Sequence, residues 1–246
     1  SWVHRSSHRT STKMLFDDPP EEDPHKASTD ETLPASPAEW AELSEAQKLR
    51  APRGIIFETR LEASRTLRAL GNSRFAAGRL DAALEAYRRA FWHVDFDLGY
   101  VRLELTEAHQ RDVFACQLPL QLNMAQCLLR SEDSSVAEAK RLLDAALGVL
   151  AGDDPTIDDE NAPRWKVKAL YWRAKALLAQ GQYDDADADL REAATLDPHD
   201  KLVRAAVADA RTQRGALHRE QKALYDGKLG PVAAPPEGQR RWCSVM

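Results

Sequence analysis

The chain has few cysteines, no long apolar run and no excess of positive charge. Its 246 residues include only Cys116, Cys127 and Cys243, which cannot form a paired disulfide framework, so we expect a reducing compartment, the cytoplasm. No apolar stretch approaches the roughly 20 residues that a membrane-spanning helix needs. The formal net charge of −5 argues against general nucleic-acid binding, which requires clustered positive charge.

The residue patterns that catalysis and metal binding require are also missing. None of the seven histidines stands at metal-ligand spacing from another histidine or a cysteine. The sequence contains no phosphate-binding loop, nucleophile elbow or Ser–His arrangement. Cys116 and Cys127 lie in an apolar context and are expected to be small core residues. We therefore predict that the protein is not an enzyme and uses no metal or cofactor.

The first 35 residues have almost no apolar side chains. Residues 1–35 alternate charge, proline, serine and threonine, a composition that cannot offset the entropy of ordering, so we expect this extension to be disordered. Its start, "SWVHRSSHRTSTK", has no initiator Met and no acid before Asp17. The sequence leaves three interpretations open: the remnant of a transit segment, sequence upstream of a native start at Met14, or a basic tail.

Order is predicted to begin at residue 36. Ser36 suits an N-cap, Pro37 the first helical position, and Glu39 the third residue of a capping box. Trp40 and Leu43 then form a narrow apolar stripe. This pattern predicts one short amphipathic helix over residues 36–50 that docks on the main domain.

From Phe57 to Tyr225 the chain is rich in helix-forming residues and contains an internal repeat. The segment "GNSRFAAGRLDAALEAYRRA" (71–90) aligns with "AKALLAQGQYDDADADLREA" (174–193). The matched pairs are Gly71 with Ala174, Gly78 with Gly181, Ala83 with Ala186, Tyr87 with Leu190, and Ala90 with Ala193. This ladder resembles the tetratricopeptide repeat, a helix–turn–helix of about 34 residues. A looser copy lies between the two, with Ala125, Ala139, Leu143 and Ala146 at the matching positions.

Three repeats predict an all-α solenoid over residues 57–225. One helix pair cannot bury its apolar face alone, so three pairs stack and a final helix covers the last of them. Residues 200–225 are predicted to form this capping helix, and its expected inner side is Leu202, Ala206, Ala210, Leu217 and Leu224. An unrelated helical bundle is the alternative.

The resemblance is most specific to the repeat domain of FKBP-type immunophilins. A long segment, residues 93–129, follows the first repeat. Near its end it contains "NMAQC" (123–127), which is similar to an Asn-Leu-Ala-x-Cys motif of that group. A two-residue insertion in the second repeat resembles the small free-standing three-repeat relatives. We expect no isomerase domain, because residues 1–56 are too few and contain no strand pattern.

This resemblance implies a protein partner, such as a heat-shock chaperone whose tail ends Glu-Glu-Val-Asp. Members of the group bind that tail with cationic and amide donors that converge from several helices. The corresponding positions here give the candidate peptide-binding residues Arg68, Asn72, Asn123, Lys168 and Arg173. The fifth family position itself falls on Trp172, and Arg173 is one step around the helix. The alternative is that these are ordinary polar groups on a surface that binds another peptide.

The chain ends in a segment that is expected to be extended and flexible. Residues 226–246 are rich in Gly, Pro and Ala and finish with Cys243-Ser-Val-Met. This ending fits a C-a-a-X lipidation motif in which Met favours farnesyl on Cys243. Arg240 and Arg241 would each add about 1 kcal/mol near anionic lipid, so we expect reversible membrane association. The motif has no such meaning if the protein continues past Met246 or lies inside an organelle.

Together these patterns predict a cytoplasmic, co-chaperone-like adaptor that binds a partner peptide and visits membranes. The alternative is a structural repeat subunit of a large organellar or ciliary assembly.

Overall fold

The computed structural model describes residues 36–131, 135–152, 156–157 and 160–225. These residues form helices and connecting turns, and they include no strand. The predicted extension at 1–35, the tail at 226–246 and the lipidation candidate Cys243 lie outside the described residues. None of the described helices is both long enough and apolar enough to cross a membrane.

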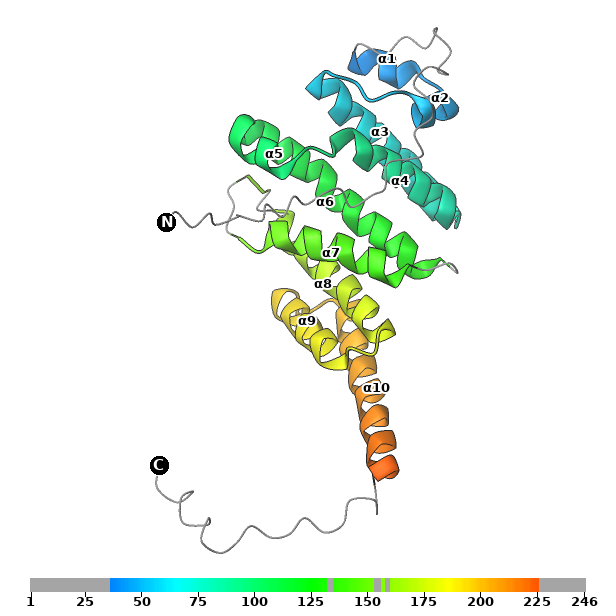
Figure 1. Cartoon of the computed structure of the whole chain (residues 1–246), viewed down its shortest axis with the longest axis vertical. Helices are drawn as coiled ribbons and strands as arrows, with labels where there is room; N and C mark the ends of the chain where they lie inside the picture. The colour runs from blue at the N-terminus through cyan, green and yellow to red at the C-terminus, as the bar shows by residue number, and fades with distance from the viewer. Residues whose placement is uncertain (1–35, 132–134, 153–155, 158–159, 226–246) are drawn as a thin grey trace, which may run out of the picture.

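Three antiparallel helix pairs stack in chain order, as the repeat predicted. In Figure 1 the pairs follow one another along the long axis, and a long final helix continues from the third pair. The pairs are α3 (Phe57–Ala76) with α4 (Leu80–Val94), α6 (Glu107–Arg130) with α7 (Val136–Leu150), and α8 (Ala162–Ala179) with α9 (Tyr183–Leu196), followed by α10 (Lys201–Tyr225). The all-α solenoid expected from the sequence is confirmed.

The turns inside the first and third pairs have the same geometry. Gly78 and Gly181 both have φ of +75°, a left-handed conformation that strains any residue with a β-carbon. The amide of Gly78 donates to the carbonyl of Phe75 at 2.9 Å, and that of Gly181 donates to Leu178 at 3.0 Å. Glycine therefore ends the first helix of each pair and turns the chain into the second.

The predicted ladder is the packing seam of each pair. Ala83, Ala90, Ala186 and Ala193 are fully buried, as are Tyr87 and Leu190 at the larger positions. The closest approach is at Gly71, where a β-carbon would lie 2.5 Å from the Tyr87 ring. Small residues let the two helices approach, and large ones fill the remaining space around the contact.

The long segment between the first two pairs adds helical structure. It forms the short helix α5 (Leu98–Glu104), which is N-capped by Asp97, and the first turns of α6. The α6 helix begins after Thr106, whose hydroxyl accepts from the amide of His109. This insertion makes α6 longer than α3 or α8 at its N-terminal end.

The single helix expected at 36–50 is wrong, because the structure has two. Helix α1 (Pro37–Glu42) ends where Leu43 is extended, with ψ of 141°, and α2 (Glu45–Arg50) starts at a new N-cap, Ser44. Ser44 and Gln47 form a reciprocal capping box there, and this second start signal outweighs the continuous stripe.

Helix α1 covers the free end of the first pair. Trp40 is buried and meets the ring of His93 edge-on at 5.3 Å. His93 is itself buried, with Trp92 on another side at 5.0 Å. Burial lowers the pKa of His93 to about 3, and the charges of Arg89, Arg53 and Arg60 act in the same direction. The imidazole is therefore neutral at physiological pH and packs as an aromatic ring.

Helix α10 covers the other end, and of its expected inner side Ala206 and Ala210 are buried and Leu217 is half-buried. Its buried residues are Val203, Ala206 and Ala210, whereas Leu202 and Leu224 are 65% and 62% exposed. Leu202 lies one residue, about 100°, away from the buried stripe. The C-terminal half of α10 extends beyond α9 (Figure 1), so none of the described helices packs against Leu224.

We expect Gly71→Ala to lower the free energy of unfolding by about 1–3 kcal/mol, because the new methyl group would overlap the buried Tyr87 ring. Gly148→Ala is the matched control: a β-carbon there meets nothing within 4 Å. Since alanine is the better helix former, this change should stabilise the protein by about 0.5–1 kcal/mol. Urea denaturation followed by circular dichroism measures both changes, and equal effects would contradict the close approach at Gly71.

Candidate functional site

The first helices of the three pairs lie next to one another and bring three predicted site residues together. Helix α6 contacts both α3 and α8. Asn72 on α3, Asn123 on α6 and Lys168 on α8 form a connected series, which we call the amide–lysine row. The Asn123 amide nitrogen donates to Asn72 Oδ1 at 3.2 Å, and Lys168 Nζ donates to Asn123 Oδ1 at 3.2 Å. The row therefore spans all three repeats.

A fourth residue, Tyr87, fixes the start of the row. Its hydroxyl donates to Asn72 Oδ1 at 2.8 Å. The ring is buried between α3 and α4, and this burial raises the pKa of Tyr87 to about 12, so the phenol remains a donor at neutral pH. Tyr87 belongs to the predicted packing ladder, but its contact with Asn72 was not anticipated.

The hydrogen bonds within the row leave several N–H hydrogens unused, and none of the row's acceptors is negatively charged. Both amide oxygens accept bonds from row members or Tyr87. Hydrogens remain on the exposed amide nitrogen of Asn72, on Asn123 and on the ammonium group of Lys168. An acceptor with several lone pairs, such as a carboxylate, matches this set.

The positive charges at the row have no acidic partner among the described residues. Arg68 lies one turn before Asn72 on α3, is half-buried, and makes no ion pair within the described part of the chain. Lys168 is also half-buried and forms no ion pair there. Burial lowers the pKa of Lys168, and the nearby charge of Arg130 lowers it further. The site is therefore electrostatically prepared for an anion.

Arg173, the fifth predicted residue, does not join the row. Its guanidinium makes two hydrogen bonds to Asp189 of α9, each at 2.7 Å, and a third to Asp144 of α7 at 3.1 Å. The hydrogen bonds to Asp189 are the main reason that the pKa of Arg173 is raised above its ordinary value. The step of about 100° from Trp172 turns Arg173 toward the second helices. Its observed role is to tie the second repeat to the third.

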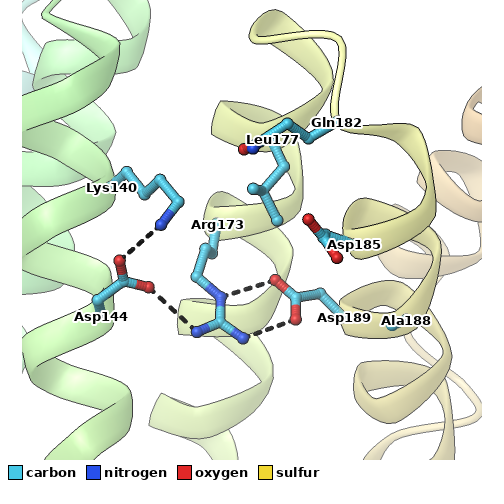
Figure 2. Close-up of a pocket in the computed structure, with 8 residues that line it drawn as sticks. All are labelled: Lys140, Asp144, Arg173, Leu177, Gln182, Asp185, Ala188 and Asp189. Atoms are coloured by element: carbon cyan, nitrogen blue, oxygen red, sulfur yellow. Dashed lines mark hydrogen bonds and ion pairs between the residues drawn. The ribbon is translucent and has the colours of Figure 1, made fainter.

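A pocket of about 300 Å³ surrounds this ion-pair network, separate from the row. Figure 2 shows Arg173 between the two carboxylates, with Lys140 bonded to Asp144 at 2.8 Å. Leu177, Gln182, Asp185 and Ala188 complete the lining. Each cation that lines the pocket is already paired with a lining carboxylate, so the pocket lacks the unpaired charges of the row.

The two described cysteines are core residues, as expected. Cys116 and Cys127 are buried and unpaired. Burial raises the pKa of both thiols, to about 11 for Cys127, so they are protonated at neutral pH and poor nucleophiles.

One cation near the row was not among the predicted site residues. Arg130, at the end of α6, lies between two aromatic rings: its Cζ is 5.4 Å from the centroid of Phe75 and 5.3 Å from that of Trp172. Helical periodicity could have indicated it, because position 130 is seven residues, about two turns, after Asn123. The aromatic partners come from other repeats and are not visible in the local sequence.

The fold defines the class of protein: a stack of tetratricopeptide helix pairs. The family model described as "Tetratricopeptide repeat" matches residues 167–200, which include most of α8 and all of α9. The C-terminal tetratricopeptide-repeat domain of a Plasmodium falciparum FK506-binding protein has the same fold. It superposes with a TM-score of 0.53 at 18% identity and covers 67% of this chain and 96% of that domain.

Two curated relatives place the similarity among peptidyl-prolyl isomerases that carry such repeats. Peptidyl-prolyl cis-trans isomerase FKBP42 of Arabidopsis thaliana is 28% identical over 187 residues, which are 75% of this chain and 46% of that protein. Peptidyl-prolyl cis-trans isomerase D of Eremothecium gossypii is 29% identical over 174 residues, 71% of this chain and 42% of that protein. The chain spans less than half the length of either relative, and the matches fall on their repeat regions. The resemblance to the FKBP-type repeat domain is confirmed.

Arg173→Ala should lower the free energy of unfolding by about 2–3 kcal/mol, because it leaves the largely buried Asp189 carboxylate without its bidentate partner. Arg88→Ala is the matched control, since it removes a more exposed inter-repeat ion pair with Glu138 and should cost about 0–1 kcal/mol. Thermal and urea denaturation of both variants check this. If Arg173→Ala costs no more than Arg88→Ala, the structural role of Arg173 is contradicted.

Proposed function

We propose that this protein is a co-chaperone-like adaptor whose amide–lysine row binds the C-terminal carboxylate of a partner protein. The observation that supports the proposal best is the convergence of Asn72, Asn123 and Lys168 from three repeats into one hydrogen-bonded series. Arg68, one turn away on α3, adds a second cation that has no acidic partner among the described residues. A heat-shock chaperone tail that ends in acidic residues is the partner chemistry that fits these donors.

The chemistry of the row favours a terminal carboxylate over a neutral segment. A carboxylate offers about four acceptor sites, which match the hydrogens left on the two amides and the ammonium group. Its negative charge would also offset the half-buried charge of Lys168, which has no acid beside it among the described residues. A neutral peptide carbonyl would leave that charge uncompensated.

The repeat architecture agrees with this use. Stacked helix pairs present their first helices as one extended surface for a partner, and the row lies on those helices. The described N-terminal helices α1 and α2 pack at the end of the stack, against α3. Among the described residues, therefore, this segment leaves the row accessible.

The membrane-binding part of the proposal concerns Cys243. If Met246 is the native C-terminus, the ending Cys-Ser-Val-Met is a substrate for farnesylation. One farnesyl group gives marginal, reversible membrane binding, so the adaptor would visit membranes as well as work in the cytoplasm.

We expect the full chain to bind a peptide that ends Glu-Glu-Val-Asp, and to lose binding when the terminal carboxylate is amidated. Lys168→Ala should weaken binding at least about tenfold, because it removes a charge-assisted hydrogen bond worth about 1.5–3 kcal/mol. Isothermal titration calorimetry measures these affinities.

Lys166→Ala is the matched control for this experiment. Lys166 is on the same helix but pairs with Glu192 of α9 at 2.8 Å, so its loss should leave binding within about twofold. Equal binding of the acid and amide peptides, or equal effects of the two lysine variants, would contradict the proposal that the row binds a carboxylate.

Intact-mass spectrometry of the protein isolated from its native cells tests the lipidation. We expect a mass that corresponds to farnesyl on Cys243, with removal of the last three residues. Cys243→Ser should abolish both the added mass and membrane sedimentation. An unmodified Cys243 in the native protein would refute this part of the proposal.

A further inference from the structure

The guanidinium group of Arg130 lies over aromatic rings from both neighbouring repeats. Phe75 comes from α3 and Trp172 from α8, and both centroids lie about 5.4 Å or less from the guanidinium carbon. The three helices that supply this arrangement are the three that supply the amide–lysine row. Aromatic contacts of this kind attract a cation and limit the positions of a long side chain.

The hydrogen-bonding groups of Arg130 are nevertheless available. The residue is exposed, and it makes no hydrogen bond or ion pair with the described residues. Guanidinium carries five N–H donors in a planar fork that matches a carboxylate. A guanidinium group that lies over two rings and has no carboxylate partner in the described part of the chain is suited to bind an anion from another molecule.

Arg130 lies on the same side of α6 as the row. Seven residues separate it from Asn123, which is close to two full turns, so the two side chains leave the helix in nearly the same direction. Its charge is near enough to Lys168 and Tyr171 to affect both groups. Trp172 stands at the position where the resemblance to the immunophilin group implies an arginine. The cation that α8 lacks is therefore present, but it comes from α6.

The spacing indicates which peptide can reach both places. Seven residues of helix advance about 10 Å, and an extended peptide advances about 3.3 Å per residue. An extended peptide that runs along α6 from a terminal carboxylate at Asn123 toward Arg130 would therefore place the residue three positions before its last one beside Arg130.

We propose that Arg130 is a specificity-determining residue that selects partners with an acidic side chain three positions before the C-terminal residue. This inference rests on the proposed function, because it takes the row as the site of the terminal carboxylate. It adds the position and charge of a second recognition element, and it gives Trp172 a role as the ring that positions Arg130.

The test is a double-mutant cycle with the full chain and two peptides. The peptides have a free C-terminal carboxylate and differ in Glu or Gln three positions before the end. We expect the wild type to prefer the Glu peptide about tenfold, as for a charge-assisted bidentate pair. Arg130→Gln should reduce that preference to less than about twofold and still distinguish acid from amidated peptides.

Arg111→Gln is the matched control, since Arg111 is an exposed arginine on the same helix that pairs with Glu107 at 3.7 Å. It should keep the full preference for Glu. A preference that survives Arg130→Gln, or one for Glu at another position only, overturns the inference while the row remains valid. If the wild type binds the free-acid and amidated peptides equally well, the proposed function itself is refuted. Circular dichroism confirms that each variant is folded.

Discussion

The whole arrangement depends on how closely α3 and α4 approach at Gly71. Because this residue has no side chain, the Tyr87 ring can lie where a β-carbon would otherwise be, and the ring fills the space between the helices. That position delivers the phenol hydroxyl to Asn72, which then accepts from Asn123, which in turn accepts from Lys168. A packing contact inside the first repeat thus orients polar groups across all three.

Much of this could be predicted because each repeat carries the same pattern of structurally required residues. The small residues at Ala83 and Ala186, and the left-handed glycines at Gly78 and Gly181, are local requirements that recur at matching positions. The row members Asn72, Asn123 and Lys168 followed from a resemblance in which motif position specifies the helix face. In both cases one residue and its neighbours along the chain carried enough information.

What could not be predicted depends on partners that are distant in sequence. Arg173 is bound by Asp144 and Asp189, and neither can be paired with it before the second and third repeats are docked. Arg130 likewise owes its position to rings on two other helices. On α10, Ala206 and Ala210 are buried as predicted, but Val203 occupies the next buried position in place of its neighbour Leu202. The break between α1 and α2 is different in kind: Ser44 and Gln47 were visible in the sequence, but the apolar stripe suggested continuity.

The way Trp40 packs has a practical meaning for anyone who trims this protein to a minimal fragment. Recognisable repeat signal starts near Phe57, yet Trp40 and Ala51 form a small core with Ala63, and Trp40 covers the neutral ring of His93. A fragment that starts at the first repeat would expose the apolar surface that Trp40 covers. It would also expose the His93 imidazole to water, where this group can take up a proton near neutral pH. The folding unit therefore includes Trp40 and the helix that carries it, which precede the first repeat in the sequence.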